Sequence, residues 1–514
     1  MLKRFSFISM ITVGLQILMS CNAPKSDFTL LENTPRISPD YSSLIIPPNI
    51  APLNFNIDEE GSEYFVEIYS EKGKKISLRQ SSPKILIPID KWHQLLKVNQ
   101  GKSLNIDIYA RKDKWYKYAS ITDTIATEPI DNHLVYRLIG LIYSDGDKLG
   151  IYQRNIENFD QSVIFENTST EKTACINCHS FSNNNPDKMS FHVRKAYNGT
   201  VISNNGNFTK YNTKTENTMA PAAYTAWHPN GELVAFSVNK LFVYFTSNED
   251  KLVEVCDQVS DLILFNVKTN TISSSPKISG PDRENLPNWS PDGKWLYFIS
   301  APKINKSMSS WVDAKYDLLR IPFDPGSLEW GDVDTLLTSK QTGLSITWPV
   351  ASPDGRYILF CMIDHSYFSI FDQNSDLYLL DLQTKKYQKT DVINSPSTES
   401  YHAWSKNGRW IVFSSKRLDK ISTRLFMAYF DKDGNFHKPF VLPQEDPLFY
   451  KDFRWHYNLP TMVNGKVKID PDKLKDFVPK NPVGVSYDRT VSIDTLTLDT
   501  LEKNNNSDYF RNSH

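Results

Sequence analysis

The sequence predicts an all-β fold, in which an N-terminal β-sandwich-like domain is followed by a β-propeller of about six blades. Three observations carry this prediction. Short alternating strands separated by turn residues fill residues 41–150, one strand–turn–strand unit recurs four times beyond residue 195, and a further alternating strand follows each copy. With 514 residues, of which 40% are apolar, the chain can bury the cores of two or more domains.

The N-terminus is typical of an export signal. A basic start is followed by a short apolar run and then by Leu18-Met19-Ser20-Cys21, which resembles a bacterial lipobox. We therefore expect residues 1–20 to be a lipoprotein signal peptide and Cys21 to carry the lipid that anchors the protein to a membrane. The alternative is an ordinary secretory signal with an incidental cysteine. Residues 21–40 are polar and contain prolines, so we expect a tether there.

Charge and export limit the possible partners. The 58 basic and 59 acidic residues leave a formal net charge of −1, which excludes the basic field that nucleic-acid binding needs. The lipobox predicts a location in the cell envelope, as an outer-membrane lipoprotein on either its periplasmic or its surface face. We expect an envelope protein or a redox protein as the partner.

The segment 41–150 is predicted to form the β-sandwich-like domain. Runs such as YFVEIYS (64–70) and SLNIDIYA (103–110) alternate as half-buried strands do, and Gly, Asn, Asp and Lys separate them. One or two helical turns are expected at DKWHQLLKV (90–98).

Four copies of one unit follow at spacings of 53 to 62 residues, measured between their glycines. The copies are AWHPNGELVAFSV (226–238), NWSPDGKWLYFIS (288–300), VASPDGRYILFCM (350–362) and AWSKNGRWIVFSS (403–415). Each contains a turn whose glycine suits the left-handed conformation, namely Gly231, Gly293, Gly355 and Gly408. A second alternating strand trails each copy, so each unit holds about four strands, which is one propeller blade.

The repeat resembles the TolB-like family of β-propellers, whose hallmark is Trp-Ser-Pro-Asp-Gly before an apolar strand and a later Asp-Leu-aromatic strand. Residues 289–293 and Asp376-Leu377-Tyr378 match that hallmark. The resemblance covers roughly residues 185–440 and implies a TolB-like propeller, which we place at 196–470. His228, Lys406 and the missing Asp-Leu of the last unit depart from the pattern and leave the blade number open.

Two further blades are expected from weaker signals. The stretch NNPDKMSFHV (184–193) has the turn and the apolar strand, with Lys188 in the glycine position, and strands at 454–469 supply another blade. Residues 471–514 are expected to be a C-terminal extension that ends in a poorly ordered polar tail.

The segment 151–195 contains Cys175-Ile176-Asn177-Cys178-His179, which fits the C-x-x-C-H signature of c-type haem attachment. Here Cys175 and Cys178 would hold a covalent haem c, and His179 would be the proximal iron ligand. Export supports this interpretation. The alternatives are a structural zinc site, a redox dithiol, and a disulfide or idle thiols. Cys256 and Cys361 lie in apolar strands and are expected to be buried free thiols.

A distal iron ligand could come from Met189 or His192. Strand alternation places Met189 on one face and places His192 and Arg194 on the other. His192 is slightly favoured because Arg194 beside it could pair with a haem propionate. Other histidines, such as His133, His228, His402 and His456, stay open and are more often structural.

The order of lipobox, β-rich domain, CINCHSF and TolB-like repeats resembles a group of Bacteroidetes lipoproteins labelled TolB-like or cytochrome c biogenesis proteins, which implies an envelope role. We expect a haem-bearing lipoprotein whose propeller binds a partner or ligand, for electron transfer or redox sensing. The alternatives are a haem-free propeller scaffold of an outer-membrane complex and a haem peroxidase. No G-x-S-x-G, H-E-x-x-H or phosphate-loop motif points to another enzyme.

Overall fold

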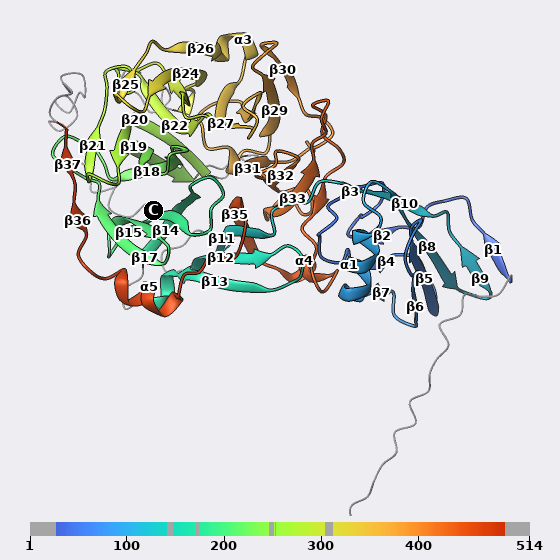
Figure 1. The fold of residues 1–514 in the computed structure, drawn as a ribbon. Helices are drawn as coiled ribbons and strands as arrows, with labels where there is room; N and C mark the ends of the chain where they lie inside the picture. Colours follow the sequence, from blue (N-terminus) through green and yellow to red (C-terminus); the bar gives the residue numbers. More distant parts are fainter. Residues whose placement is uncertain are drawn as a thin grey trace, which may run out of the picture.

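The computed structural model describes residues 27–140, 148–170, 174–245, 251, 253–303 and 312–488. Figure 1 shows two parts, a smaller N-terminal domain and a ring of blades. Among the described residues no helix is both long and apolar enough to cross a membrane. The predicted signal peptide and Cys21 lie outside the described residues.

The N-terminal domain consists of two sheets and one helix, as the β-sandwich-like prediction requires. The larger sheet contains β1 (Phe28–Leu30), β3 (Ile45–Ile46), β5 (Glu63–Tyr69), β6 (Ile76–Gln80), β8 (Ser103–Arg111), β9 (Trp115–Lys117) and β10 (Ile121–Ile125). The smaller sheet contains β2 (Ile37–Ser38), β4 (Phe55–Ile57) and β7 (Lys84–Ile85). Helix α1 (Ile89–Lys97) forms where a short helix was expected, and it buries Trp92, whose Nε1 donates to the Ile50 carbonyl at 2.9 Å.

This domain begins earlier than the predicted tether allows. Strand β1 pairs in parallel with β9, and β2 pairs with β4, so residues from 28 onward belong to the fold. Ile37 is 7% exposed, because the apolar residues of this polar stretch face the domain core. The predicted tether at residues 21–40 is therefore wrong for residues 28–40.

The described residues form the six predicted blades, which are numbered in the chain order of their inner strands, and the four or five blade strands pair antiparallel. Blade 1 contains β14 (Ala174–Phe181), β15 (Lys188–Lys195), β16 (Gly199–Asn204) and β17 (Asn207–Asn212). Blade 2 contains β18 (Ala222–Trp227), β19 (Leu233–Phe245), β20 (Val253–Asn266) and β21 (Thr271–Ser273). Blade 3 contains β22 (Arg283–Trp289), β23 (Trp295–Ala301), β24 (Asp317–Asp324), β25 (Glu329–Trp330) and β26 (Asp334–Leu337).

Blades 4 and 5 repeat the same order, and short helices connect some strands. Blade 4 contains β27 (Ser345–Ala351), β28 (Tyr357–Ile363), β29 (Asp376–Asp381) and β30 (Lys386–Lys389). Blade 5 contains β31 (Glu399–Trp404), β32 (Trp410–Ser415), β33 (Arg424–Tyr429) and β34 (Phe440–Val441). The connecting helices are η1 (Asn167–Ser169), α3 (Ser339–Thr342), η2 (Ser369–Phe371) and α4 (Phe449–Asp452).

Blade 6 closes the ring by joining two distant parts of the chain. Its inner strand is β35 (Trp455–Val463), and its outer strands are β11 (His133–Gly140), β12 (Leu149–Asn155) and β13 (Gln161–Glu166). The antiparallel pairing of β11 with β35 runs from His133 against Val463 to Gly140 against Trp455. The propeller therefore starts inside the segment that was expected to belong to the sandwich domain.

The repeated turns take the predicted backbone conformation. Gly231, Gly293, Gly355 and Gly408 have φ between 66° and 73°. The turn of blade 1 differs from the expectation, because Lys188 opens β15 and the left-handed residues are Asn183 and Asn184, at φ 52° and 56°. Asparagine tolerates this region, which explains why a glycine is not needed there.

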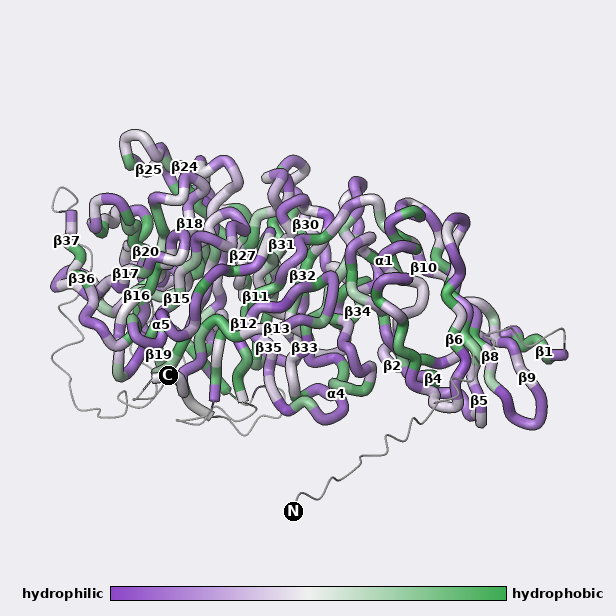
Figure 2. The backbone as a smooth tube through the Cα atoms, turned by 60° about the horizontal axis from the view of Figure 1, so that its bottom comes forward, coloured by the Kyte–Doolittle hydropathy of each residue, from purple (hydrophilic) through white to green (hydrophobic). Residues whose placement is uncertain are grey.

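The hydrophobic cores lie inside the blades and between neighbouring blades. Apolar residues follow the blade strands, and hydrophilic residues dominate the turns at the periphery (Figure 2). One core cluster extends from the N-terminal domain into blades 4 and 5, and it contains both Trp92 and Trp410. Trp410 Nε1 donates to the Glu128 carbonyl at 3.0 Å, and Lys438 Nζ lies 2.7 Å from an Asp40 carboxylate oxygen. The N-terminal domain is thus packed on blade 5.

The C-terminal extension is partly ordered along the ring. Helix α5 (Pro471–Phe477) is capped by Asp470, and β36 (Val483–Gly484) and β37 (Ser486–Tyr487) pair in parallel with the outer strands of blades 1 and 2. Figure 1 shows this segment along the outer edge of both blades. The tail that was expected to be poorly ordered lies beyond the described residues.

Candidate functional site

Every inner strand carries one residue with a left-handed backbone. Their φ values lie between 45° and 52°, and each sits where the pairing with the second strand shifts register, as in a β-bulge. These residues are Cys178, Tyr224, Leu286, Trp348, Tyr401 and Leu459. Such a conformation costs a non-glycine residue about 1–3 kcal/mol and is concentrated at functional sites. Six equivalent bulges therefore mark the propeller axis.

The six bulges surround a cavity of about 170 Å³. Two or three consecutive residues from each blade line it, namely residues 178–180, 224–225, 286–288, 348–350, 401–403 and 459–461. Trp348 packs edge-on against Tyr224 and Tyr401, with ring centroids 5.8 and 4.5 Å away. The wall is therefore largely aromatic and apolar, and Cys178 contributes a thiol to it.

The two cysteines of the C-x-x-C-H motif occupy different surroundings. Cys178 is half-buried at the cavity wall, and burial raises the pKa of its thiol. Cys175 is 7% exposed and pairs across the sheet with Arg194, so both side chains lie on the face toward blade 2. Both cysteines are free thiols.

His179 occupies the opposite face of the same strand. It follows the bulge, and its buried ring lies against the backbone of Val135 and Leu459 in blade 6. Neither ring nitrogen has a hydrogen-bond partner among the described residues. Burial and then the Arg137 charge lower the pKa of His179 to about 3, so the imidazole is neutral at neutral pH.

The predicted distal ligands are held by other contacts. His192 is fully buried, and its Nδ1 and Nε2 lie 2.9 and 3.0 Å from the hydroxyl oxygens of Thr200 and Thr225. Met189 is fully buried in the core between blades 1 and 6. The expected separation of the two residues onto opposite faces is therefore correct. In this arrangement His192 contacts threonine hydroxyls and Met189 contacts apolar side chains.

Two guanidinium groups flank the motif. Arg194 donates through Nη2 to the Ala222 carbonyl of blade 2, and Arg137 donates through Nη1 to the Asn177 side-chain oxygen. Arg194 Nη1 and Arg137 Nε are buried without a partner among the described residues. Sequence reasoning singled out Arg194 but missed Arg137, which belongs to a strand more than 30 residues before the motif.

The residues of the motif do not fit a covalent haem in this arrangement. Attachment requires both thiols to reach one edge of the porphyrin while the imidazole reaches the iron. Cys175 instead faces blade 2, and His179 faces blade 6. The cavity of about 170 Å³ is also smaller than the roughly 300 Å³ at which pockets for drug-sized ligands begin. The described residues contain no cluster of three or more His, Cys, Asp or Glu side chains suited to a metal ion.

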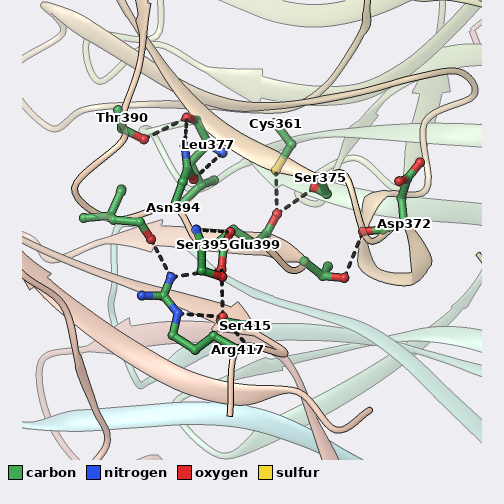
Figure 3. Close-up of polar contacts among 12 residues, drawn as sticks. Cys361, Asp372, Ser375, Leu377, Thr390, Asn394, Ser395, Glu399, Ser415 and Arg417 are labelled. Atoms are coloured by element: carbon green, nitrogen blue, oxygen red, sulfur yellow. Dashed lines mark hydrogen bonds and ion pairs between the residues drawn. The ribbon is translucent and has the colours of Figure 1, made fainter. Parts of the chain in front are cut away.

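The remaining cysteines have structural surroundings. Cys256 and Cys361 are buried free thiols, as expected. Cys361 lies at the junction of blades 4 and 5, with its Sγ 3.8 Å from the Glu399 carbonyl (Figure 3). The fully buried Glu399 carboxylate accepts from Ser395, Ser415 and Arg417, and its distance to Arg417 Nη2 is 2.9 Å (Figure 3). This network stabilises the blade junction and lies outside the cavity.

The left-handed residues of the inner strands were not predicted from the sequence, because they share no residue type. A positional signal nevertheless exists. Tyr224, Leu286, Trp348 and Tyr401 each stand seven positions before the turn glycine of their blade. Counting back from the turns would have identified the cavity wall.

Comparisons with known proteins add the following. No family model matches the sequence, and no curated protein matches it. Among solved structures, a protein assigned as TolB from Agrobacterium tumefaciens is 14% identical, with a TM-score of 0.35, over 64% of this chain and 98% of that chain. Oligogalacturonate lyase from Vibrio parahaemolyticus is 13% identical, with a TM-score of 0.31, over 56% of this chain and 85% of that chain. The β-propeller domain of the Trilobed protease from Pyrococcus furiosus is 11% identical, with a TM-score of 0.32, over 66% of this chain and 82% of that chain. Because these TM-scores are low, the assignment to an all-β propeller rests on the strand pairing of this chain.

Proposed function

We propose that this protein is a membrane-anchored envelope lipoprotein whose propeller binds a small ligand in its axial cavity, beside the thiol of Cys178. The observation that carries the proposal is that all six blades contribute consecutive residues to one cavity wall. Propellers gather residues of many blades around the axis, which suits binding. No chemical step is assigned to the site.

The aromatic wall supports binding of a planar or apolar group. Tyr224, Trp348 and Tyr401 present ring surfaces that contact a ligand at little cost in side-chain entropy. The Trp348 Nε1 is buried without a partner among the described residues, and it is available as a donor. The wall therefore combines apolar contact with polar groups that fix orientation.

The proposed envelope location and the proposed partner are supported by the sequence. The lipobox supports lipidation at Cys21. Without haem, the propeller would serve as a ligand-binding scaffold for an envelope protein. Replacing Cys21 by Ser should release the protein from the membrane fraction of a bacterium that processes lipoproteins. Retention of the Cys21→Ser variant on the membrane would contradict the anchor.

The cavity is tested by the reaction of Cys178 with iodoacetamide at mildly alkaline pH, followed by peptide mass spectrometry. We expect Cys178 to react while the buried Cys256 and Cys361 do not. Ala403→Phe, which fills the cavity wall, should slow the reaction about tenfold or more. Ala119→Phe, at a half-buried alanine of the N-terminal domain, is the control. An unreactive Cys178, or an equal rate in both variants, would contradict the proposed site.

A second candidate function is the covalent haem c that the motif predicts, serving electron transfer or redox sensing, or peroxidase chemistry at an open iron. One observation favours it, namely that both His179 ring nitrogens are buried without a partner among the described residues. The protein would be produced in a host that attaches c-type haem, and a denaturing gel would be stained for haem. Pigment that is lost in the Cys175→Ala, Cys178→Ala double variant would favour this candidate over the haem-free one.

A further inference from the structure

Two guanidinium groups lie beside the motif, behind the cavity wall that Cys178 helps to form, because Arg137 bonds the neighbouring Asn177 and Arg194 pairs across the sheet with Cys175. Arg137 is only 9% exposed, and its Nε has no partner among the described residues. Arg194, on the strand next to the motif, leaves Nη1 unpartnered and buried. Neither guanidinium forms an ion pair with a carboxylate of the described residues. Their hydrogen-bond acceptors are the neutral Asn177 side chain and the Ala222 carbonyl.

This arrangement differs from that of a buried arginine with a structural role. At the junction of blades 4 and 5, Arg417 lies 2.9 Å from the Glu399 carboxylate. Burying an ionised group without a counter-charge is expensive, and proteins normally place a carboxylate beside it. The charges of Arg137 and Arg194 therefore have no neutralising carboxylate among the described residues, and both act to lower the pKa of the nearby Cys178 thiol against the larger effect of burial.

We propose that Arg137 and Arg194 form an anion subsite beside Cys178, which binds a carboxylate or phosphate group of the cavity ligand. This inference rests on the proposed function and specifies the ligand as anionic. Guanidinium forks suit both oxyanions. The aromatic wall then contacts the remainder of the ligand.

The test compares two thiol reagents that differ in charge. With either reagent, the Cys178 thiolate sulfur displaces iodide from carbon, and an S–C bond forms while iodide leaves. Iodoacetate carries a carboxylate, and iodoacetamide is neutral. The ratio of their rates at Cys178 cancels any effect of the arginines on thiolate formation, because that effect is common to both reagents. The ratio therefore reports the attraction of the subsite for an anion.

We expect Arg194→Gln and Arg137→Gln each to lower the iodoacetate-to-iodoacetamide ratio about tenfold, and Arg194→Lys to retain most of it. Arg36→Gln, which removes a charge from an exposed side chain of the N-terminal domain, should leave the ratio unchanged. In the unaltered protein, inorganic phosphate and acetate, at matched ionic strength, should each slow iodoacetate more than iodoacetamide. Stronger competition by phosphate would identify a phosphate group on the ligand, and stronger competition by acetate a carboxylate.

The outcomes separate this inference from the proposal beneath it. If neither reagent modifies Cys178, the proposal that Cys178 lines an accessible ligand cavity is wrong. If iodoacetamide reacts but the ratio is the same in the Arg194→Gln and Arg36→Gln variants, or if neither anion competes, the subsite is wrong and the cavity stands. The competition arm uses the unaltered chain, so it decides even if the arginine variants fail to fold.

Discussion

His179 and His402 occupy the same position in blades 1 and 5, one residue after the left-handed residue of the inner strand. Each ring lies against the second strand of the preceding blade, at Val135 and Leu359 respectively. His402 donates from Nε2 to the Leu359 carbonyl at 2.8 Å, whereas the ring of His179 lies beside the backbone of Val135 and Leu459 without reaching hydrogen-bond geometry. The histidine of the haem-like motif is thus one of two equivalent blade-junction histidines.

Replacing each histidine by leucine should have different effects on stability. His402→Leu removes the hydrogen bond to a buried carbonyl, so we expect a loss of about 1–3 kcal/mol in the free energy of unfolding. His179→Leu removes only the approach of the ring to the Val135 and Leu459 backbone, which does not reach hydrogen-bond geometry, so the loss should be clearly smaller than that for His402→Leu. Urea unfolding of both variants measures the difference. Equal losses would show that His179 makes a structural bond after all.

Stability should fall as the pH decreases below 6.5. Burial lowers the pKa of His179 to about 3 and that of His402 to about 4, from 6.5 in the unfolded chain. Between these values and 6.5 only the unfolded state binds the protons. Each histidine therefore contributes stability that is complete above pH 6.5 and is lost as the pH falls, by about 1.4 kcal/mol per pH unit.

The His402→Leu variant isolates one of these contributions. Its free energy of unfolding should depend less steeply on pH between 6.5 and 4 than that of the unaltered protein, because the carboxylates are common to both. Urea titrations across this range give the slopes. Identical slopes would mean that His402 is protonated, or accessible to protons, in the folded protein.

The ion pair between Glu399 and Arg417 should contribute more to the free energy of unfolding than an exposed ion pair does. Glu399 is fully buried, so Arg417→Leu leaves an unpaired carboxylate, and we expect a loss of about 3–5 kcal/mol. Arg356 forms a pair of the same 2.9 Å length with Asp381 at a more exposed site, and Arg356→Leu should cost less than about 1 kcal/mol. Thermal unfolding of both variants makes the comparison. Similar losses would contradict the structural role of the buried network.

Asp261 should destabilise the protein at alkaline pH. Burial and then the charge of Glu284 raise the pKa of Asp261 to about 8, so the folded chain holds a proton that the unfolded chain releases above pH 3.8. The contribution of Asp261 to the free energy of unfolding is therefore complete below pH 3.8 and is lost as the pH rises towards 8. Asp261→Asn should therefore raise the free energy of unfolding at pH 8 by roughly 3–4 kcal/mol more than at pH 5. A gain independent of pH would refute this assignment.

The turns could be predicted from sequence because their chemistry is local. A glycine after Pro-Asp or Pro-Asn specifies the left-handed position within a few residues, and Gly293 and Gly355 adopt it. The strand pairing of blade 6 could not be predicted from local patterns. Its strands β11 and β35 are separated by most of the chain, and neither sequence indicates that it pairs with the other.

The interpretation of the C-x-x-C-H motif shows a related limit. Spacing along the chain places two thiols and an imidazole together, but the bulge at Cys178 turns the strand and sends Cys175 and His179 to opposite faces. Alternation correctly separated Met189 from His192, because β15 is regular there. Arg137 lies beside the motif only because blade 6 closes the ring next to blade 1, and no local sequence pattern predicts that closure.

The chemical state of Cys178 in protein purified from the membranes of a bacterium that attaches c-type haem tests the central claim most directly. Intact-mass and peptide mass spectrometry would be combined with a haem stain and with iodoacetamide labelling. We expect no covalent pigment, and a Cys178 thiol that iodoacetamide labels and that Ala403→Phe protects. A haem bound through Cys175 and Cys178 would contradict the account.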